Sequence, residues 1–223
     1  MPKWFLPAVV VCGLMFAVSP LVIANAPYES TMLMVQKIFY FHVPSWIAMT
    51  AALSVCGIAS AIYLFHGSPN ADRLAVAGAE LAVLFGVFGL VSGSLWARKA
   101  WGVWWDWNAR LTMALLLELI FFGYLLVRKY GGPGSEKLAA AMGIFGAATA
   151  PFVYKSVDWW RTVHPNTSLV RTLGTSSPEM YSTLLFCAVA FLLLFTVLLI
   201  ARVGLEERRA ALDRLYLALQ EVG

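Results

Sequence analysis

Six long apolar stretches constrain the fold of this chain more than any other feature of its sequence. They cover residues 4–25, 45–65, 76–96, 111–128, 138–154 and 181–202, and each is close to the length of about 20 residues that an α-helix needs to cross a bilayer. Only 13% of the residues are charged and 61% are hydrophobic, whereas a soluble domain of this length has far more charge. We therefore predict an all-α, polytopic integral membrane protein. A single membrane domain over residues 1–223 would hold six transmembrane helices surrounded by lipid, and residues 203–223 would form a cytoplasmic tail.

The basic residues indicate which side of the membrane holds the termini. Six spans place both termini on one side, where nine of the 16 basic residues lie: Lys3, Arg73, Arg128, Lys129, Lys137, Arg202, Arg208, Arg209 and Arg214. The other side holds Lys37, Arg98, Lys99, Arg110, Lys155, Arg161 and Arg171. Because basic residues favour cytoplasmic loops, we expect cytoplasmic termini. The opposite face then carries eight of the nine tryptophans, an asymmetry that an aromatic belt at both interfaces does not explain.

Two histidines on that outer face each stand close before a proline, in His42-Val43-Pro44 and in His164-Pro165. A residue that precedes proline is driven out of helical geometry, and Pro44 suits the first turn of the second span. We therefore expect both imidazoles at the membrane surface, outside helix interiors. The alternative is two unrelated loop histidines that bond to their neighbours.

The stretch WGVWWDWNAR, residues 101–110, places four tryptophans in seven positions. Helical spacing would put Trp101, Trp104, Trp105 and Asn108 on one face, with Asp106 and Trp107 pointing elsewhere. A surface helix anchored by interfacial aromatics is the simpler interpretation, but it leaves the second pair, Trp159 and Trp160, unexplained. Aromatic rings between two histidines favour a flat, apolar ligand with axial nitrogen ligands, namely haem. Its propionates could meet the outer cations, which are Arg98, Lys99, Arg110, Arg161 and Arg171.

At these residues the chain resembles the haem exporter protein C (CcmC) family of the cytochrome c maturation system. The segments that carry the resemblance are IFYFHVPSW, WGVWWDWNARLT and VDWWRTVHPNTS, in that order. The resemblance implies a bacterial inner-membrane protein whose periplasmic face binds haem b. His42 and His164 would be the axial ligands of the haem iron. The haem would lie on the tryptophan-rich segment.

The same resemblance implies a function and a set of partners. The haem would pass to a periplasmic haem chaperone (CcmE), with a small membrane adaptor (CcmD) and ATP-binding-cassette subunits (CcmA and CcmB) as further partners. In one position the chain departs from the family, because Asn108 stands where an aspartate is usual. Since an amide oxygen can accept the same hydrogen bond, we expect Asn108→Asp to be nearly silent in haem delivery and Asp106 to face solvent.

Three other functions are weighed against this one. A cytochrome c haem lyase or synthase of the same superfamily is the main alternative, although such chains are typically longer. A cytochrome b would need histidines inside facing helices, and a permease would need broken polar half-helices. We expect no catalysis, since no nucleophile, general acid or nucleotide motif is visible, and no nucleic-acid partner. Glu118 in the fourth span is a functional candidate or a hydrogen-bonded acid that joins two helices.

Overall fold

The computed structural model describes residues 2–160 and 177–222. Within them the chain forms six helices that are long and apolar enough to span a membrane and no β-strand. The helices are α1 (Phe5–Asn25), α2 (Phe39–His66), α3 (Pro69–Ala100), α4 (Ala109–Tyr130), α5 (Ser135–Trp159) and α7 (Pro178–Val222). A short 3₁₀ helix, η1 (Met34–Ile38), runs directly into α2. The predicted all-α architecture with six transmembrane helices is confirmed.

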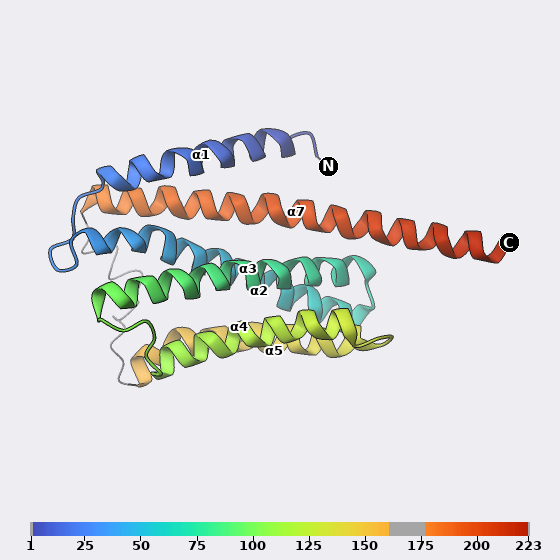
Figure 1. The fold of residues 1–223 in the computed structure, drawn as a ribbon. Helices are drawn as coiled ribbons and strands as arrows, with labels where there is room; N and C mark the ends of the chain where they lie inside the picture. Colours follow the sequence, from blue (N-terminus) through green and yellow to red (C-terminus); the bar gives the residue numbers. More distant parts are fainter. Residues whose placement is uncertain (1, 161–176, 223) are drawn as a thin grey trace.

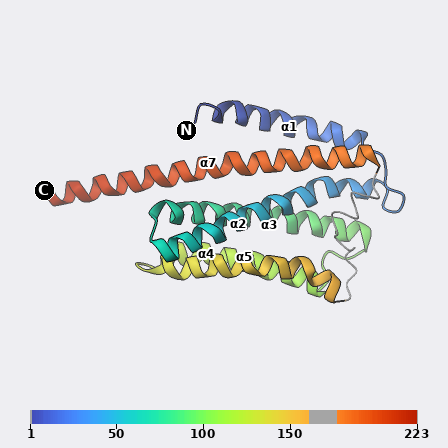
Figure 2. The ribbon, with the colours of Figure 1, turned by 180° about the vertical axis from the view of Figure 1, so that it is seen from behind.

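The helices run up and down in a layered bundle (Figure 1). The layers follow in the order α1, α7, the α2–α3 pair and the α4–α5 pair. Seen from behind, α2 lies between α7 and α5 (Figure 2), and it contacts both as well as α3. Both chain ends point toward the same end of the bundle, as an even number of spans requires. We call the opposite end, where α2 begins and α3 ends, the outer end.

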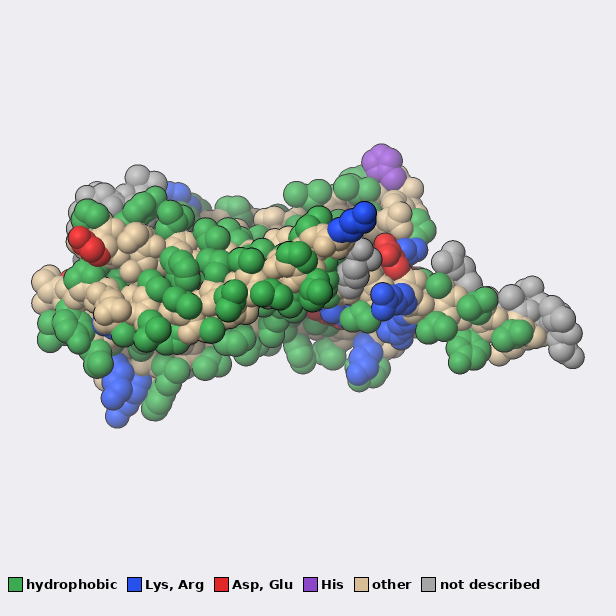
Figure 3. Space-filling model, turned by 90° about the horizontal axis from the view of Figure 1, so that it is seen from above, with side chains coloured by type: hydrophobic (Ala, Val, Ile, Leu, Met, Phe, Trp, Pro, Cys, Tyr) green, Lys and Arg blue, Asp and Glu red, His purple; other side chains and the backbone are tan. Residues whose placement is uncertain are grey.

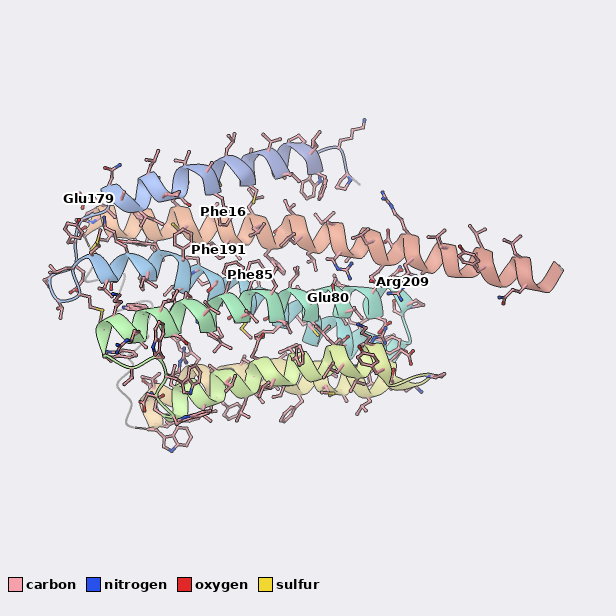
Figure 4. All side chains as sticks on the ribbon, in the orientation of Figure 1. Phe16, Glu80, Phe85, Glu179, Phe191 and Arg209 are labelled. Carbon is pink, nitrogen blue, oxygen red and sulfur yellow. The ribbon has the colours of Figure 1, made fainter. Side chains whose placement is uncertain are left out.

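The helices pack closely because small residues line their contacts. A Cβ added to Gly78 would lie 2.8 Å from the backbone nitrogen of Cys56, and one added to Gly57 would lie 2.4 Å from Cβ of Ala147. Such close approach is typical of helix pairs in lipid. Aromatic contacts join α1 and α7 to the α2–α3 pair. The ring centroid of Phe191 in α7 lies 5.3 Å from that of Phe16 in α1 and 6.3 Å from that of Phe85 in α3 (Figure 4).

The molecular surface agrees with a membrane-spanning bundle. Hydrophobic side chains cover most of the face shown in Figure 3, and charged side chains gather toward its two ends. At the inner end, Arg128 of α4 forms an ion pair of 2.7 Å with Asp72 of α3, and Arg202 of α7 pairs with Glu80 of α3. The tail is a direct continuation of α7 and extends beyond the other helices (Figure 1).

The start of α2 differs from the prediction. The helix begins at Phe39, so His42 lies inside its first turns and Pro44 is an interior helix residue. The expected position of His42 outside a helix was therefore wrong. Packing explains the difference, because Tyr40 is only 1% exposed and belongs to the same buried cluster as Ile23 of α1 and Leu184 of α7. Proline in a helix interior removes one backbone hydrogen bond, and here it is accommodated.

Candidate functional site

His42 lies at the outer end with its imidazole against α3. Its Nδ1 is 3.0 Å from Oγ of Ser92. The ring is half-buried and lies edge-on to two indoles, with centroid distances of 5.5 Å to Trp96 at 80° and 6.2 Å to Trp46 at 75°. These contacts fix the orientation of the imidazole at the end of the bundle.

The wall behind His42 is one face of α3, formed by Gly89, Ser92, Gly93 and Trp96. Their spacing of i, i+3, i+4 and i+7 places them on one side of the helix; we call it the α3 glycine face. A Cβ added to Gly93 would lie 3.0 Å from Cε1 of His42, and one added to Gly89 would lie 2.6 Å from Cε2 of Trp46. The two glycines therefore make room for the histidine and for a tryptophan.

The tryptophan-rich segment is a loop, and its predicted helical face was wrong. Helix α3 ends at Ala100 and α4 begins at Ala109, and Gly102 has a φ of +79° that a helix does not contain. Trp104 and Trp107 are 58% and 74% exposed, whereas Trp101 and Trp105 are half-buried. The loop thus presents single rings to the outside and no continuous face.

Arg98 and the tryptophan rings hold this loop together. The Arg98 guanidinium lies 6.0 Å from the ring centroid of Trp104 and donates to the carbonyl of Gly102. The rings of Trp105 and Trp107 meet edge to face with centroids 5.9 Å apart. Contacts of this kind between cation and ring or between rings contribute about 0.5–1.5 kcal/mol each.

Asn108 and Asp106 act as a pair. The Asn108 Oδ1 accepts from the backbone N–H of Leu111 at 3.0 Å and so caps α4, while its Nδ2 donates to Oδ2 of Asp106 at 2.8 Å. Asp106 is half-buried, and the expectation that it simply faces solvent was wrong. The reason is the loop geometry, which brings side chains together that a helix would have separated.

Local contacts hold the segment between α1 and α2, residues 26–38. The Glu29 carboxylate accepts from the backbone N–H groups of Met32 at 2.6 Å and Thr31 at 2.8 Å. These bonds, first the one from Met32, lower the pKa of Glu29 below its usual range. Lys37 donates to the carbonyl of Ala24 at 2.6 Å and lies over the ring of Tyr28.

The other predicted site residues lie partly within the described structure. Trp159 and Trp160 end α5 with exposed rings whose centroids are 5.8 Å apart. Arg110 is half-buried and donates to the carbonyl of Val153, which links α4 to α5, and Lys99 is exposed. His164, Arg161 and Arg171 lie outside the described residues.

Two buried indole nitrogens at the outer end lack a hydrogen-bond partner among the residues that the structure describes: those of Trp96 and Trp105. Buried donors are normally paired, so these two suit an acceptor that a ligand supplies. In the same described ranges, no three His, Cys, Asp or Glu side chains gather in a group that could hold a bare metal ion.

Glu118 lies in α4, ten residues after Asn108 and away from the outer end of the bundle. Its carboxyl is 6% exposed in the middle of α4 and has no hydrogen-bond partner in the described part of the chain. It lies against the backbone of α3 at Gly86, where an added Cβ would overlap its Oε2 at 1.9 Å.

Sequence reasoning missed Ser92 and the specific use of Gly89, Gly93 and Trp96. The spacing of these residues was visible, but two glycines four apart in an apolar stretch resemble an ordinary packing face. The α3 glycine face differs from an ordinary packing face only in the residues that lie opposite it, which are His42 and Trp46.

Comparisons with known proteins bear on what this end of the bundle does. Residues 1–215 match the family model described as Heme exporter protein C. The chain is 38% identical over 177 residues to the Heme exporter protein C of Bradyrhizobium diazoefficiens, covering 78% of this chain and 67% of that protein. It is 31% identical over 175 residues to that of Haemophilus influenzae, with coverages of 76% and 70%. With that of Escherichia coli, identity is 30% over 192 residues, with coverages of 81% and 76%.

Proposed function

The chain belongs to the Heme exporter protein C family, which handles haem in cytochrome c biogenesis, and we propose that it binds haem b at its outer, periplasmic end and delivers it to a periplasmic haem chaperone. The observation that carries this proposal is the position of His42. Its imidazole is held by Ser92 and by two indoles at the end of a transmembrane bundle. Haem is the cargo, and the protein supplies ligation and orientation.

The residues near His42 fit such a cargo. A porphyrin provides four nitrogen ligands to its iron, and the protein adds the axial ones. We propose His42 and His164 for these positions. The indole N–H groups of Trp96 and Trp105 have no acceptor within residues 2–160 and 177–222, and they would donate to carboxylates such as the propionates. Arg110 has further guanidinium N–H groups besides the one that meets Val153, since arginine carries five such donors.

The rings of the outer loops suit a docking surface for the chaperone. Trp104, Trp107, Trp159 and Trp160 are all more than half exposed, and tryptophan is enriched where proteins bind one another. We propose that CcmE docks on these rings and receives the haem there. CcmD and the ATP-binding-cassette subunits CcmA and CcmB would be partners in the inner membrane, where the termini of this chain face the cytoplasm.

The test measures haem content and chaperone loading in the same cells. His42→Ala and His164→Ala should each lower the haem that copurifies with the protein and the haem attached to the chaperone. Added imidazole should partly restore binding, because it can fill the vacated axial position. His66→Ala is the matched control, since His66 is exposed at the inner end of α2. Unchanged loading in both outer variants would contradict the proposal.

A further inference from the structure

We propose that Ser92 is the positioning residue that sets the tautomer of His42, so that Nε2 carries the lone pair that binds iron. This inference rests on the proposed ligation of haem by His42. Neutral imidazole has one N–H, and only the other nitrogen can coordinate a metal. Whatever fixes the proton on Nδ1 therefore decides whether His42 is ready to bind.

The hydrogen bonds around Ser92 assign that proton. Its hydroxyl has a single hydrogen, which it donates to the carbonyl of Phe88 at 2.7 Å, with the carbonyl of Gly89 next at 3.2 Å. Serine hydroxyls inside helices commonly donate in this way to the preceding turn. Toward Nδ1 of His42, 3.0 Å away, the Ser92 oxygen is then an acceptor. The proton consequently lies on Nδ1, and Nε2 is the unprotonated nitrogen.

The α3 glycine face keeps the imidazole in register with Ser92. Gly93 lets the ring approach so closely that an added Cβ would lie 3.0 Å from Cε1. Trp96 and Trp46 stand nearly perpendicular to the ring on α3 and α2. A half-turn of the ring, which would put Cδ2 in the place of Nδ1, would have to displace these neighbours, so packing keeps Nδ1 on the side of the ring that faces Ser92.

The bond also affects the strength of the iron ligand. Histidines that bind metals almost always donate their second N–H to an acceptor, which fixes the tautomer and makes the ligating nitrogen more basic. Loss of such an acceptor typically lowers metal affinity by about 10- to 100-fold. A weaker imidazole donor stabilises ferric iron less, and the reduction potential of the haem should rise.

The experiment titrates the detergent-purified protein, stripped of haem, with hemin and records the reduction potential of the bound haem. Ser92→Ala should lower hemin affinity roughly 10- to 100-fold and raise the potential. Ser92→Thr keeps the hydroxyl and should restore both. Ser94→Ala is the matched control, because Ser94 lies on the same helix about 200° away from Ser92. Thermal unfolding of each variant reports whether the bundle is intact.

A double-mutant comparison separates this inference from the proposed function. If Ser92 acts through His42, then Ser92→Ala adds no loss of affinity in a His42→Ala background. Equal losses in both backgrounds would overturn the role of Ser92 as a positioning residue. A normal affinity and potential in Ser92→Ala, together with weak binding in His42→Ala, would also refute it while leaving haem ligation by His42 in place. If His42→Ala itself binds hemin normally, the proposed function fails and this inference fails with it.

Discussion

Replacing Gly93 by Ala should separate haem binding from folding. The new Cβ would lie 3.0 Å from Cε1 of His42 and 3.5 Å from its Nδ1. Carbon atoms in ordinary contact are about 3.5–4.0 Å apart, so the imidazole must retreat by roughly 0.5–1 Å. The bond of 3.0 Å between Nδ1 and Ser92 would then lengthen to about 3.5 Å or more, beyond the usual range of hydrogen bonds.

The stability of the bundle should change much less than haem affinity. Extra volume in a packed contact costs about 1–3 kcal/mol. Alanine in place of glycine inside a helix stabilises the folded state by about 0.5–1 kcal/mol. The two terms oppose each other, and the net loss should stay below about 2.5 kcal/mol. Haem affinity, in contrast, should fall roughly 10- to 100-fold, because the imidazole loses its second hydrogen bond.

The assay is hemin titration in detergent, with thermal unfolding measured on the same preparation. Gly13→Ala in α1 is the control, because an added Cβ there meets nothing within 4 Å, and it should bind haem like the wild type. Wild-type affinity in Gly93→Ala would refute the reasoning, since the histidine would then tolerate displacement from Ser92.

Three further predictions concern topology, the tryptophan loop and the buried acid. Reporter fusions after Pro133 and after Gly223 should both report cytoplasm; a periplasmic signal from either would reverse the sides. Asn108→Asp should lower the thermal midpoint of unfolding. The new carboxylate can still accept from the backbone N–H of Leu111, but it replaces the hydrogen bond of 2.8 Å to Asp106 by repulsion between two carboxylates. The exchange Asp106→Asn with Asn108→Asp should recover the midpoint, and failure to do so would show that the pair is not reciprocal. Glu118→Gln should unfold at or above the wild-type temperature, because the carboxyl has no hydrogen-bond partner in the described ranges. A large drop in the unfolding temperature would show that the carboxyl does have a partner.

The spans could be predicted from the sequence because hydropathy and length are local properties of each stretch. The apolar block at 4–25 became α1 at Phe5–Asn25 with almost the same ends. The start of α2 could not be predicted in the same way. Pro44 signals a helix start locally, whereas burial of Tyr40 between α1 and α7 extends the helix to Phe39.

The candidate site was only partly predictable for a related reason. His42 stood out as one of two outer histidines, and the structure does place it at the outer end. The hydrogen-bond partner of its imidazole, Ser92, comes from α3, fifty residues further along, and nothing in the sequence states which helix faces which. The loop at 101–108 shows the opposite error, because helical spacing was assumed where Gly102 and the Asn108 cap interrupt the helix. The relation of His42 to His164 stays a prediction.

The most direct test of haem ligation at the outer end is the low-temperature electron paramagnetic resonance spectrum of the purified, oxidised protein. We predict a low-spin ferric signal from two imidazole ligands. His42→Ala and His164→Ala should each convert it to a high-spin signal, and His66→Ala should leave it unchanged. A low-spin signal that persists in His42→Ala would contradict haem ligation by His42, because the iron would then be held by residues other than the histidine that Ser92 orients.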